Sequence, residues 1–305
     1  MSTVDTTAEL RAARDSSRAR SYMERQGRWK SVAGLAPIVV WQIVFFVVPL
    51  ALLAVYSFWR LVNYRVDYTF TLYNYLDIFS NRLLLDALLL SLQVAVVVTI
   101  VCAILAYPIA YFIAKKAGRW RTLLLILVIV PFWTSFILRA YAWKLLLGER
   151  GFINSGLTIL GALDEPISYL LYSPVATSIG LIYAFLPFYI LPLYTSIDKV
   201  QDSWLAAAQD LGATPMRAFF EVTFPLCVPG LVVGAVFTFI FAVGDYVIPQ
   251  LLGGGKSLLI AQAIVLEFET SQNWPGGAAL SMVLLVIILA ILAATLRWIR
   301  MEDVV

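Results

Sequence analysis

The sequence predicts an all-α integral membrane protein with about six transmembrane helices. Its composition is the first observation: 61% of the 305 residues are hydrophobic and only 13% are charged. An average soluble domain carries about 25% charged residues. The second observation is that the apolar residues gather in runs of about 20 or more, the length a helix needs to cross the hydrocarbon core of a bilayer. We therefore expect a helix bundle with lipid as its solvent.

Six spans are predicted from the apolar runs and the helix-breaking residues between them. Residues 1–32 form a polar segment that is expected to be a retained cytoplasmic tail, because it is longer than the start of a signal peptide and lacks a convincing cleavage site. The first span and the loop after it fill residues 33–85, and the main transmembrane domain fills residues 86–300. The predicted spans are 33–59, 87–114, 122–147, 174–197, 228–251 and 278–299.

Charge predicts the orientation and excludes several classes of function. Fifteen Lys and Arg residues fall in the N-terminal tail, the second and fourth connections and the C-terminus, and five fall in the other connections. Because basic residues stay on the cytoplasmic side, both termini are expected in the cytoplasm. The net charge is only +3, and the basic residues form no stripe that could follow a phosphate backbone, which argues against nucleic-acid binding. The chain has no His and two Cys, which argues against a His-type metal site, a disulfide framework and His-based catalysis.

The residue pattern of the fourth connection, residues 198–227, predicts two short helices around a glycine turn. Ser203 is a candidate cap for the first helix, and Gly212 can end that helix in the left-handed conformation. Thr214 followed by Pro215 is typical of the start of a second helix.

Apolar side chains in this connection are too numerous to leave in water, and polar residues flank them, which is typical of a docking surface. Pro225 is expected to stop the second helix. An amphipathic helix lying on the membrane is the alternative. However, the connection holds two basic and four acidic residues, and anionic lipid would repel that balance. The apolar residues are Phe219, Phe220, Val222 and Phe224, and the polar ones are Asp210, Arg217 and Glu221.

The stretch AAAQDLGATPMRAFFEVTFP, residues 206–225, resembles the cytoplasmic EAA loop of permeases of binding-protein-dependent ABC importers. The pattern of that family is E-A-A, three residues, G, nine residues and then I-x-L-P. Ala206 stands where the family has Glu, which puts one polar contact with the ATPase in question. The residues expected in this coupling loop are Ala206, Ala207, Ala208, Asp210, Gly212, Arg217, Val222, Phe224 and Pro225.

This resemblance implies the type I ABC importer permease fold in the bacterial cytoplasmic membrane. It implies as partners two ATPase subunits, a second homologous permease and an extracytoplasmic solute-binding protein. ATP and Mg²⁺ would be bound by the ATPase, and this chain would hold no cofactor, no metal and no catalytic residue. It would move its solute by alternating access.

Four further stretches resemble the permeases of spermidine/putrescine importers. A polyamine is therefore the implied substrate, although related branches carry other small organic solutes. A self-contained channel or secondary carrier, and an intramembrane enzyme, are the competing classes. The stretches are VPFWTSFILRAYAWKLLL (130–147), LPFYILPLYTSIDKV (186–200), VGDYVIPQLLGGGKSLLIAQ (243–262) and NWPGGAALS (273–281).

Asp245 is the clearest candidate for contact with a cationic solute, because an ionised carboxylate within a membrane is costly and usually functional. Aromatic side chains around a carboxylate would suit an organic ammonium through ion pairing and cation–π attraction. Pairing of Asp245 with Arg139, predicted at similar depth, is an equally weighted alternative. Helix packing is the alternative role of the aromatic residues. These candidates are Phe132, Trp133, Tyr141 and Tyr246, with Tyr183 and Tyr189 as further aromatic faces.

Glu267 and Glu269 flank Phe268 in the last outward connection. They are candidates for receiving a cationic solute or contacting a binding protein. A solvated acidic loop is the favoured alternative.

Overall fold

The computed structural model of the chain describes residues 36–298, except 162–164, 166 and 168–169. The chain divides into two compact units, Met1–Tyr56 and Ser57–Val305. Among the described residues, five helices are long and apolar enough to cross a membrane, or six if one bent pair counts as a single span. This confirms the predicted number. The predicted tail at 1–32 and the last residue of the predicted sixth span lie outside the described residues.

The first unit contains one apolar helix, Ala36–Tyr56, with a mean hydropathy of 2.7. Its middle is a π-helical turn, η1 (Ile43–Val47), which is followed by α2 (Val48–Tyr56). This turn ends two residues before Pro49, which has no N–H to donate. The first N–H after the turn donates to the carbonyl of the first residue in it. The widened turn thus keeps backbone groups paired next to a proline, as hydrocarbon requires.

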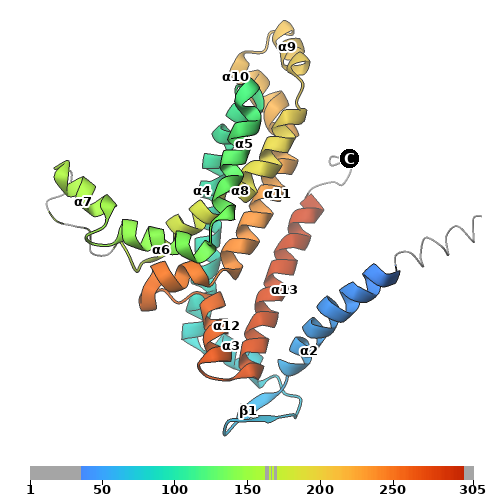
Figure 1. The fold of residues 1–305 in the computed structure, drawn as a ribbon. Coiled ribbons are helices and arrows are strands. Elements are labelled where there is room, and N and C mark those ends of the chain that lie inside the picture. Colours follow the sequence, from blue (N-terminus) through green and yellow to red (C-terminus); the bar gives the residue numbers. More distant parts are fainter. Residues whose placement is uncertain (1–35, 162–164, 166, 168–169, 299–305) are drawn as a thin grey trace, which may run out of the picture. The chain divides into compact units, whose positions relative to one another are not determined.

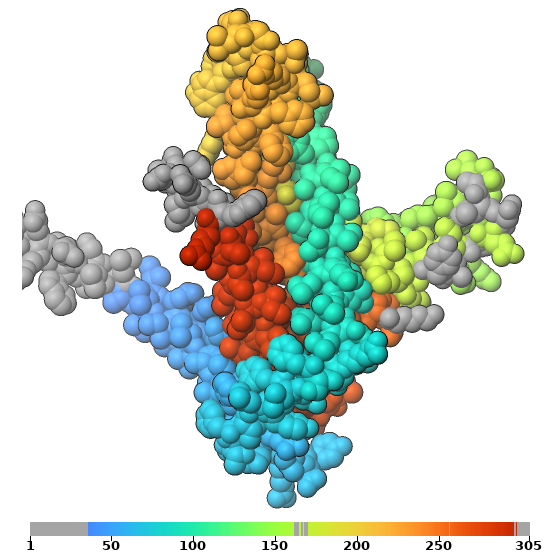
Figure 2. Space-filling view, turned by 180° about the vertical axis from the view of Figure 1, so that it is seen from behind, coloured from blue at the N-terminus to red at the C-terminus, as the bar shows by residue number. Residues whose placement is uncertain are grey.

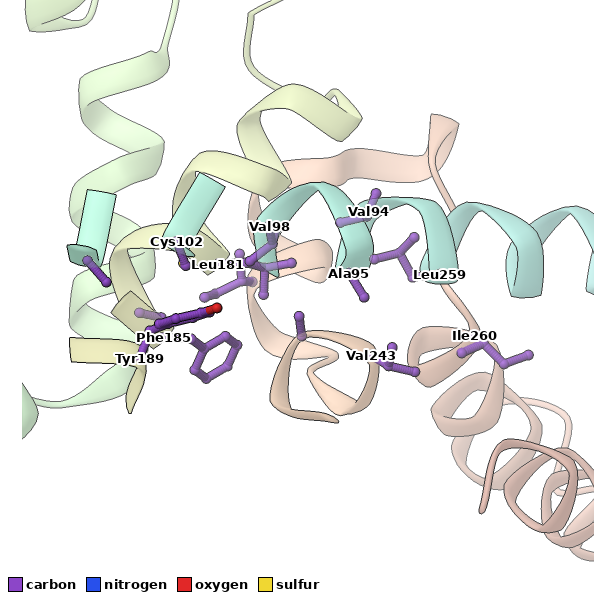
Figure 3. Close-up of a cluster of buried hydrophobic side chains, with 14 of the residues drawn as sticks. Val94, Ala95, Val98, Cys102, Leu181, Phe185, Tyr189, Val243, Leu259 and Ile260 are labelled. Atoms are coloured by element: carbon purple, nitrogen blue, oxygen red, sulfur yellow. The ribbon is translucent and has the colours of Figure 1, made fainter. Parts of the chain in front are cut away.

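Three long helices form the centre of the second unit: α4 (Arg82–Lys115), α8 (Pro174–Lys199) and α11 (Phe224–Gly244). Small side chains line the buried face of α4 and let the other two helices approach it. Figure 3 shows some of them beside Leu181 and Phe185 of α8 and Val243 of α11 in the common core. The fully buried residues of this face are Ala95, Val98, Cys102, Ala106 and Ala110.

Two glycines bring α11 close to α8. A Cβ atom at Gly230 would lie 2.7 Å from the backbone oxygen of Pro192, and a Cβ atom at Gly234 would lie 2.7 Å from the ring of Tyr189. Their GxxxG spacing places both on one helix face, where small residues allow backbones to approach.

The predicted third span, 122–147, falls on the bent pair of helices, so it is broken rather than continuous. The segments Gly118–Trp133 and Phe136–Ile159 are bent by 92°. Pro131 lacks an N–H, and the hydroxyl of Thr134 donates to its carbonyl at 2.7 Å, so a side chain satisfies a backbone group where the helix ends. The elements are η2 (Gly118–Trp120), α5 (Arg121–Ile129), η3 (Val130–Trp133), α6 (Phe136–Leu147) and α7 (Phe152–Ile159).

The predicted fifth span, 228–251, begins and ends too late. The helix that carries it runs over Pro215–Gly244, because Pro225 does not interrupt it and Asp245 follows its last residue. Two short turns, η5 (Pro249–Gly253) and η6 (Gly254–Lys256), then lead to α12 (Ile260–Glu269) and α13 (Trp274–Trp298).

The segment before α4 begins with an antiparallel hairpin of β1 (Arg60–Val62) and β2 (Arg65–Asp67), in which Leu61 is opposite Val66. Its two-residue turn has positive φ angles at both positions, as this type of tight hairpin requires. The helix α3 (Tyr73–Ser80) follows. Within the second unit, α3 and α12 lie at one end of the α4–α8–α11 bundle, and α9 (Asp202–Asp210) lies at the other (Figure 1).

Gly230→Ala is expected to destabilise the protein by about 1–3 kcal/mol, because the added methyl group meets backbone oxygen that has no rotamer to change. The thermal unfolding midpoint of the purified protein in detergent measures this loss. Gly156→Ala in α7 is the matched control, because its Cβ would meet nothing within 4 Å. Equal midpoints for the two variants would show that the α8–α11 contact is looser than described.

Candidate functional site

The loop between α8 and α11 contains two short helices around a glycine turn, as predicted. The first is α9 (Asp202–Asp210) and the second starts with α10 (Pro215–Ala218). Gly212 has a φ of 90°, and its N–H donates to the carbonyl of Gln209 at 2.8 Å. The left-handed glycine therefore ends α9 and turns the chain.

Thr214 caps the second helix, and Ser203 does not cap the first. The hydroxyl oxygen of Thr214 accepts the backbone N–H of Arg217 at 3.3 Å, and Pro215 occupies the first helical turn, which confirms this part of the prediction. The first helix was expected to begin at Trp204, and it begins two residues earlier, at Asp202. Ser203 lies inside it, and its hydroxyl donates to the side chain of Gln201 at 3.4 Å.

The prediction that Pro225 stops the second helix was wrong. A π-helical turn, η4 (Phe219–Thr223), connects α10 directly to α11. The N–H of Phe224 donates to the carbonyl of Phe219 across this turn. A π turn widens the helix by one residue, and the backbone can then pass a residue that has no N–H. The second half of the loop is consequently continuous with a membrane-spanning helix.

The tip of the loop carries its most exposed apolar side chains. Leu211 is 90% exposed, Met216 is 68% exposed and Phe220 is 58% exposed. Leu211 and Met216 were not among the predicted contacts, although their positions beside Gly212 and Pro215 indicate a tip. Figure 2 shows this loop, in yellow and orange, projecting beyond the ends of the neighbouring helices. Phe219 instead packs inward, edge-on to Tyr107 of α4 at 5.6 Å.

The other predicted loop residues are distributed around this tip. Arg217 forms an ion pair with Glu221 at 2.8 Å along the same helix. Val222 and Ala208 are half-buried. The exposed members are Ala206, Ala207, Asp210, Gly212, Phe224 and Pro225.

Asp245 lies in a non-helical break directly after α11. Its carboxylate accepts the backbone N–H of Ile248 at 2.9 Å and so caps the helical turn that follows. The described residues contain no ion pair between Asp245 and Arg139. Two nitrogens of the Arg139 guanidinium are buried without a hydrogen-bond partner, and the guanidinium lies 5.3 Å from the ring centre of Phe132. The alternative in which these two residues pair is therefore not observed.

The aromatic candidates fall into two groups. Phe132 packs edge-on against Phe188 at 4.8 Å, and Tyr189 is buried against Gly234, so these two residues pack helices together. Trp133 is 80% exposed, and Tyr141 and Tyr246 are about half exposed. These three remain available for contacts outside the described chain.

Glu267 and Glu269 have different surroundings. Glu267 accepts a hydrogen bond from the side-chain amide of Asn273 at 2.9 Å, and Phe268 packs edge-on against Trp274 at 5.4 Å. Glu269 is exposed. Glu267 therefore holds the turn between α12 and α13, while Glu269 stays free to meet solvent or a partner.

Comparison with known proteins identifies the family. The family described as "Binding-protein-dependent transport system inner membrane component" matches residues 21–299. The chain belongs to this family. It is therefore a multi-pass permease of the bacterial inner membrane, as the loop and the apolar spans predicted, and not a self-contained channel or an intramembrane enzyme.

Several characterised relatives are permeases of one kind of importer. Over 266 residues the permease is 38% identical to the spermidine/putrescine transport system permease protein PotB of Salmonella typhimurium (strain SL1344), a match that covers 87% of this chain and 92% of that protein. It is 39% identical to PotB of Haemophilus influenzae over 254 residues, which cover 83% of this chain and 88% of that protein.

The fold is also found in a solved structure. A bacterial ABC transporter involved in the import of the acidic polysaccharide alginate contains a chain that matches with a TM-score of 0.71 at 17% identity, covering 92% of the permease and 100% of that chain. This confirms the predicted type I importer permease fold.

Gly212→Ala is expected to destabilise the protein by about 1–2 kcal/mol, because an L-residue is strained at its left-handed φ. Gly212→Asn should cost much less stability, since Asn tolerates this conformation. The thermal unfolding midpoint of the purified protein in detergent measures the difference. Gly255→Ala is the control, because its Cβ would also meet nothing within 4 Å and its φ is not positive. Equal midpoints for the Ala and Asn variants would contradict the prediction.

Proposed function

We propose that this permease is the membrane subunit of an ATP-driven importer of a polyamine such as spermidine or putrescine. The identity with the PotB permeases carries the proposal, because 38% identity over 87% of this chain and 92% of the relative leaves little of either chain unmatched. The transported solute would be a small organic cation that crosses the inner membrane by alternating access.

The proposed partners are two ATPase subunits, a second homologous permease and an extracytoplasmic binding protein. The projecting apolar tip at Leu211 and Met216 would seat in the ATPase, with the loop facing the cytoplasm. A solved relative of similar fold is an alginate transporter in complex with its ligand-bound periplasmic protein, with a TM-score of 0.70, which supports delivery of solute from outside. ATP and Mg²⁺ would be bound by the ATPase, and this chain would do no chemistry.

The continuous helix from Pro215 to Gly244 supports a mechanical role for the loop. When the ATPase closes on ATP, it would displace the tip around Gly212. Because α10, η4 and α11 form one helix, this displacement would tilt α11 as a rigid rod. The break at Asp245 ends the rod, so the tilt would open or close the path near this carboxylate.

Uptake by the complete importer in proteoliposomes tests the assignment. We expect radiolabelled spermidine and putrescine to enter only with ATP and the binding protein, and unlabelled polyamine to compete. Import of a different organic solute with no polyamine uptake would overturn the substrate. Uptake by this chain alone, without the ATPase, would overturn the importer assignment.

The Asp245→Asn variant distinguishes two roles of Asp245, contact with the solute and capping of the next helical turn. The amide oxygen of Asn can still accept the N–H of Ile248, but the charge that would attract a cation is gone. We expect uptake to fall by about tenfold or more, while assembly and ATP hydrolysis persist. Asp86→Asn is the control, since Asp86 is an exposed acid on α4 whose side chain is 70% accessible.

A different result would show that Asp245 has only a structural role. In that case Asp245→Asn would transport normally, and only Asp245→Ala, which also removes the cap, would reduce the yield of folded protein. The initial rate of uptake per assembled complex distinguishes the two patterns.

A further inference from the structure

Two ion pairs tie the loop to helices that are distant from it in the sequence. The guanidinium of Arg121, the first residue of α5, donates to the carboxylate of Asp198 at 2.5 Å and also to the hydroxyl of Tyr194. The ammonium of Lys115, the last residue of α4, donates to Asp202 at 2.8 Å. Lys115 also donates to the backbone carbonyl of Val200.

These contacts differ in kind from the other ion pairs of the described residues. Arg82 with Asp86 and Arg217 with Glu221 join positions four apart on one helix, where exposed pairs contribute little to stability. The two long-range pairs instead connect the corner between α4 and α5 to the corner between α8 and α9. They join residues 77 and 87 positions apart.

The pair of Lys115 with Asp202, whose own side chain is 88% exposed, is strengthened by the burial of Lys115 and by the position of both residues at helix ends. The Lys115 side chain is only 15% exposed, so water screens it less than a surface lysine. Lys115 ends α4 and Asp202 begins α9, where the helix dipoles favour a cation and an anion respectively. The Lys115 ammonium holds the pKa of Asp202 below its ordinary value.

The guanidinium of Arg121 is fixed from two directions. Separate nitrogens contact Asp198 and Tyr194, and the guanidinium carbon lies 5.0 Å from the centre of the Tyr194 ring. A planar group held at two points resists rotation more than a single ion pair does.

We propose that Lys115, Arg121, Asp198 and Asp202, the coupling clamp, make the corner between α8 and α9 move together with the corner between α4 and α5. Movement of the loop then reaches α5 as well as α8 and α11. The movement of α5 then reaches α6 through the 92° bend between the two segments. Arg139 and Tyr141 lie on α6. The four clamp members are positioning residues, and their role rests on the proposed ATP-driven function.

Charge reversal in the complete importer tests the clamp. Arg121→Asp and Lys115→Asp should each lower solute uptake per ATP hydrolysed by about tenfold, within the range by which such couplings change. Exchanging the charges, as in Arg121→Asp with Asp198→Arg, should restore most of this ratio. Arg82→Asp is the matched control, because its exposed pair joins residues of one helix, and its ratio should not change.

Two outcomes would overturn the proposal. In one, uptake and ATP hydrolysis fall together with the amount of assembled complex, which is what a merely structural brace would produce. In the other, the exchanged pair fails to recover although the complex assembles, so that the residues act separately. If the unaltered complex imports no polyamine, the proposed function fails instead.

A distance measurement tests the clamp without any solute. Spin labels at Ser203→Cys in α9 and Leu127→Cys in α5 should keep the same separation in the nucleotide-free and ATP-bound complexes. The two native cysteines are buried and should stay unlabelled. In the Arg121→Asp variant the separation should change with ATP. A separation that changes with ATP in the unaltered complex would show that α9 and α5 move independently.

Discussion

Satisfaction of backbone hydrogen bonds in hydrocarbon is the constraint on which this structure depends. Water is absent from the bilayer core, so an unpaired N–H or carbonyl costs several kcal/mol by the order-of-magnitude estimate for apolar media. The permease nevertheless places prolines in its spans. Before Pro49 and before Pro225 the helix widens into a π turn that ends two residues earlier. At Pro131 the same constraint is met differently, with a side-chain hydroxyl and a sharp bend.

These solutions determine how the loop is connected to the membrane. If the helix had ended at Pro225, a flexible segment would connect the loop to α11. The π turn makes α10 and α11 one rod instead. Lys115 attaches the start of α9 to α4, and Arg121 attaches the end of α8 to α5. Both halves of the loop are thus held by rigid elements. A small displacement at the tip can then move helices as bodies, because packed interfaces shift as units rather than deform gradually.

The proposed solute path contains charges of both signs. Asp245 offers a carboxylate, but part of its hydrogen-bonding capacity is used to cap the next turn. The Arg139 guanidinium has two buried nitrogens without a partner in the described chain, and it lies against aromatic rings. Exposed Trp133, Tyr141 and Tyr246 lack the enclosure of a finished binding site. In the proposed pairing of two permease subunits, the second subunit would enclose these side chains.

The sequence by itself determined the fold class, the number of spans and the family. Hydrophobic run length is a direct consequence of bilayer thickness, and the spacing of the loop motif around Gly212 depends on local backbone preferences. Local chemistry also predicted the cap at Thr214. The orientation of the termini and the ATPase contacts of the loop remain predictions from charge and resemblance.

Tertiary structure alone decided the rest. Whether a proline ends, bends or passes through a helix depends on which neighbours satisfy the freed carbonyls, so Pro131 and Pro225 have opposite outcomes that residue type cannot distinguish. The partners of Lys115 and Arg121 lie 77 to 87 residues away, and only helix packing brings them together. The sequence placed Asp245 and Arg139 at similar depth, but depth does not fix the direction of a side chain, and in the structure they do not pair.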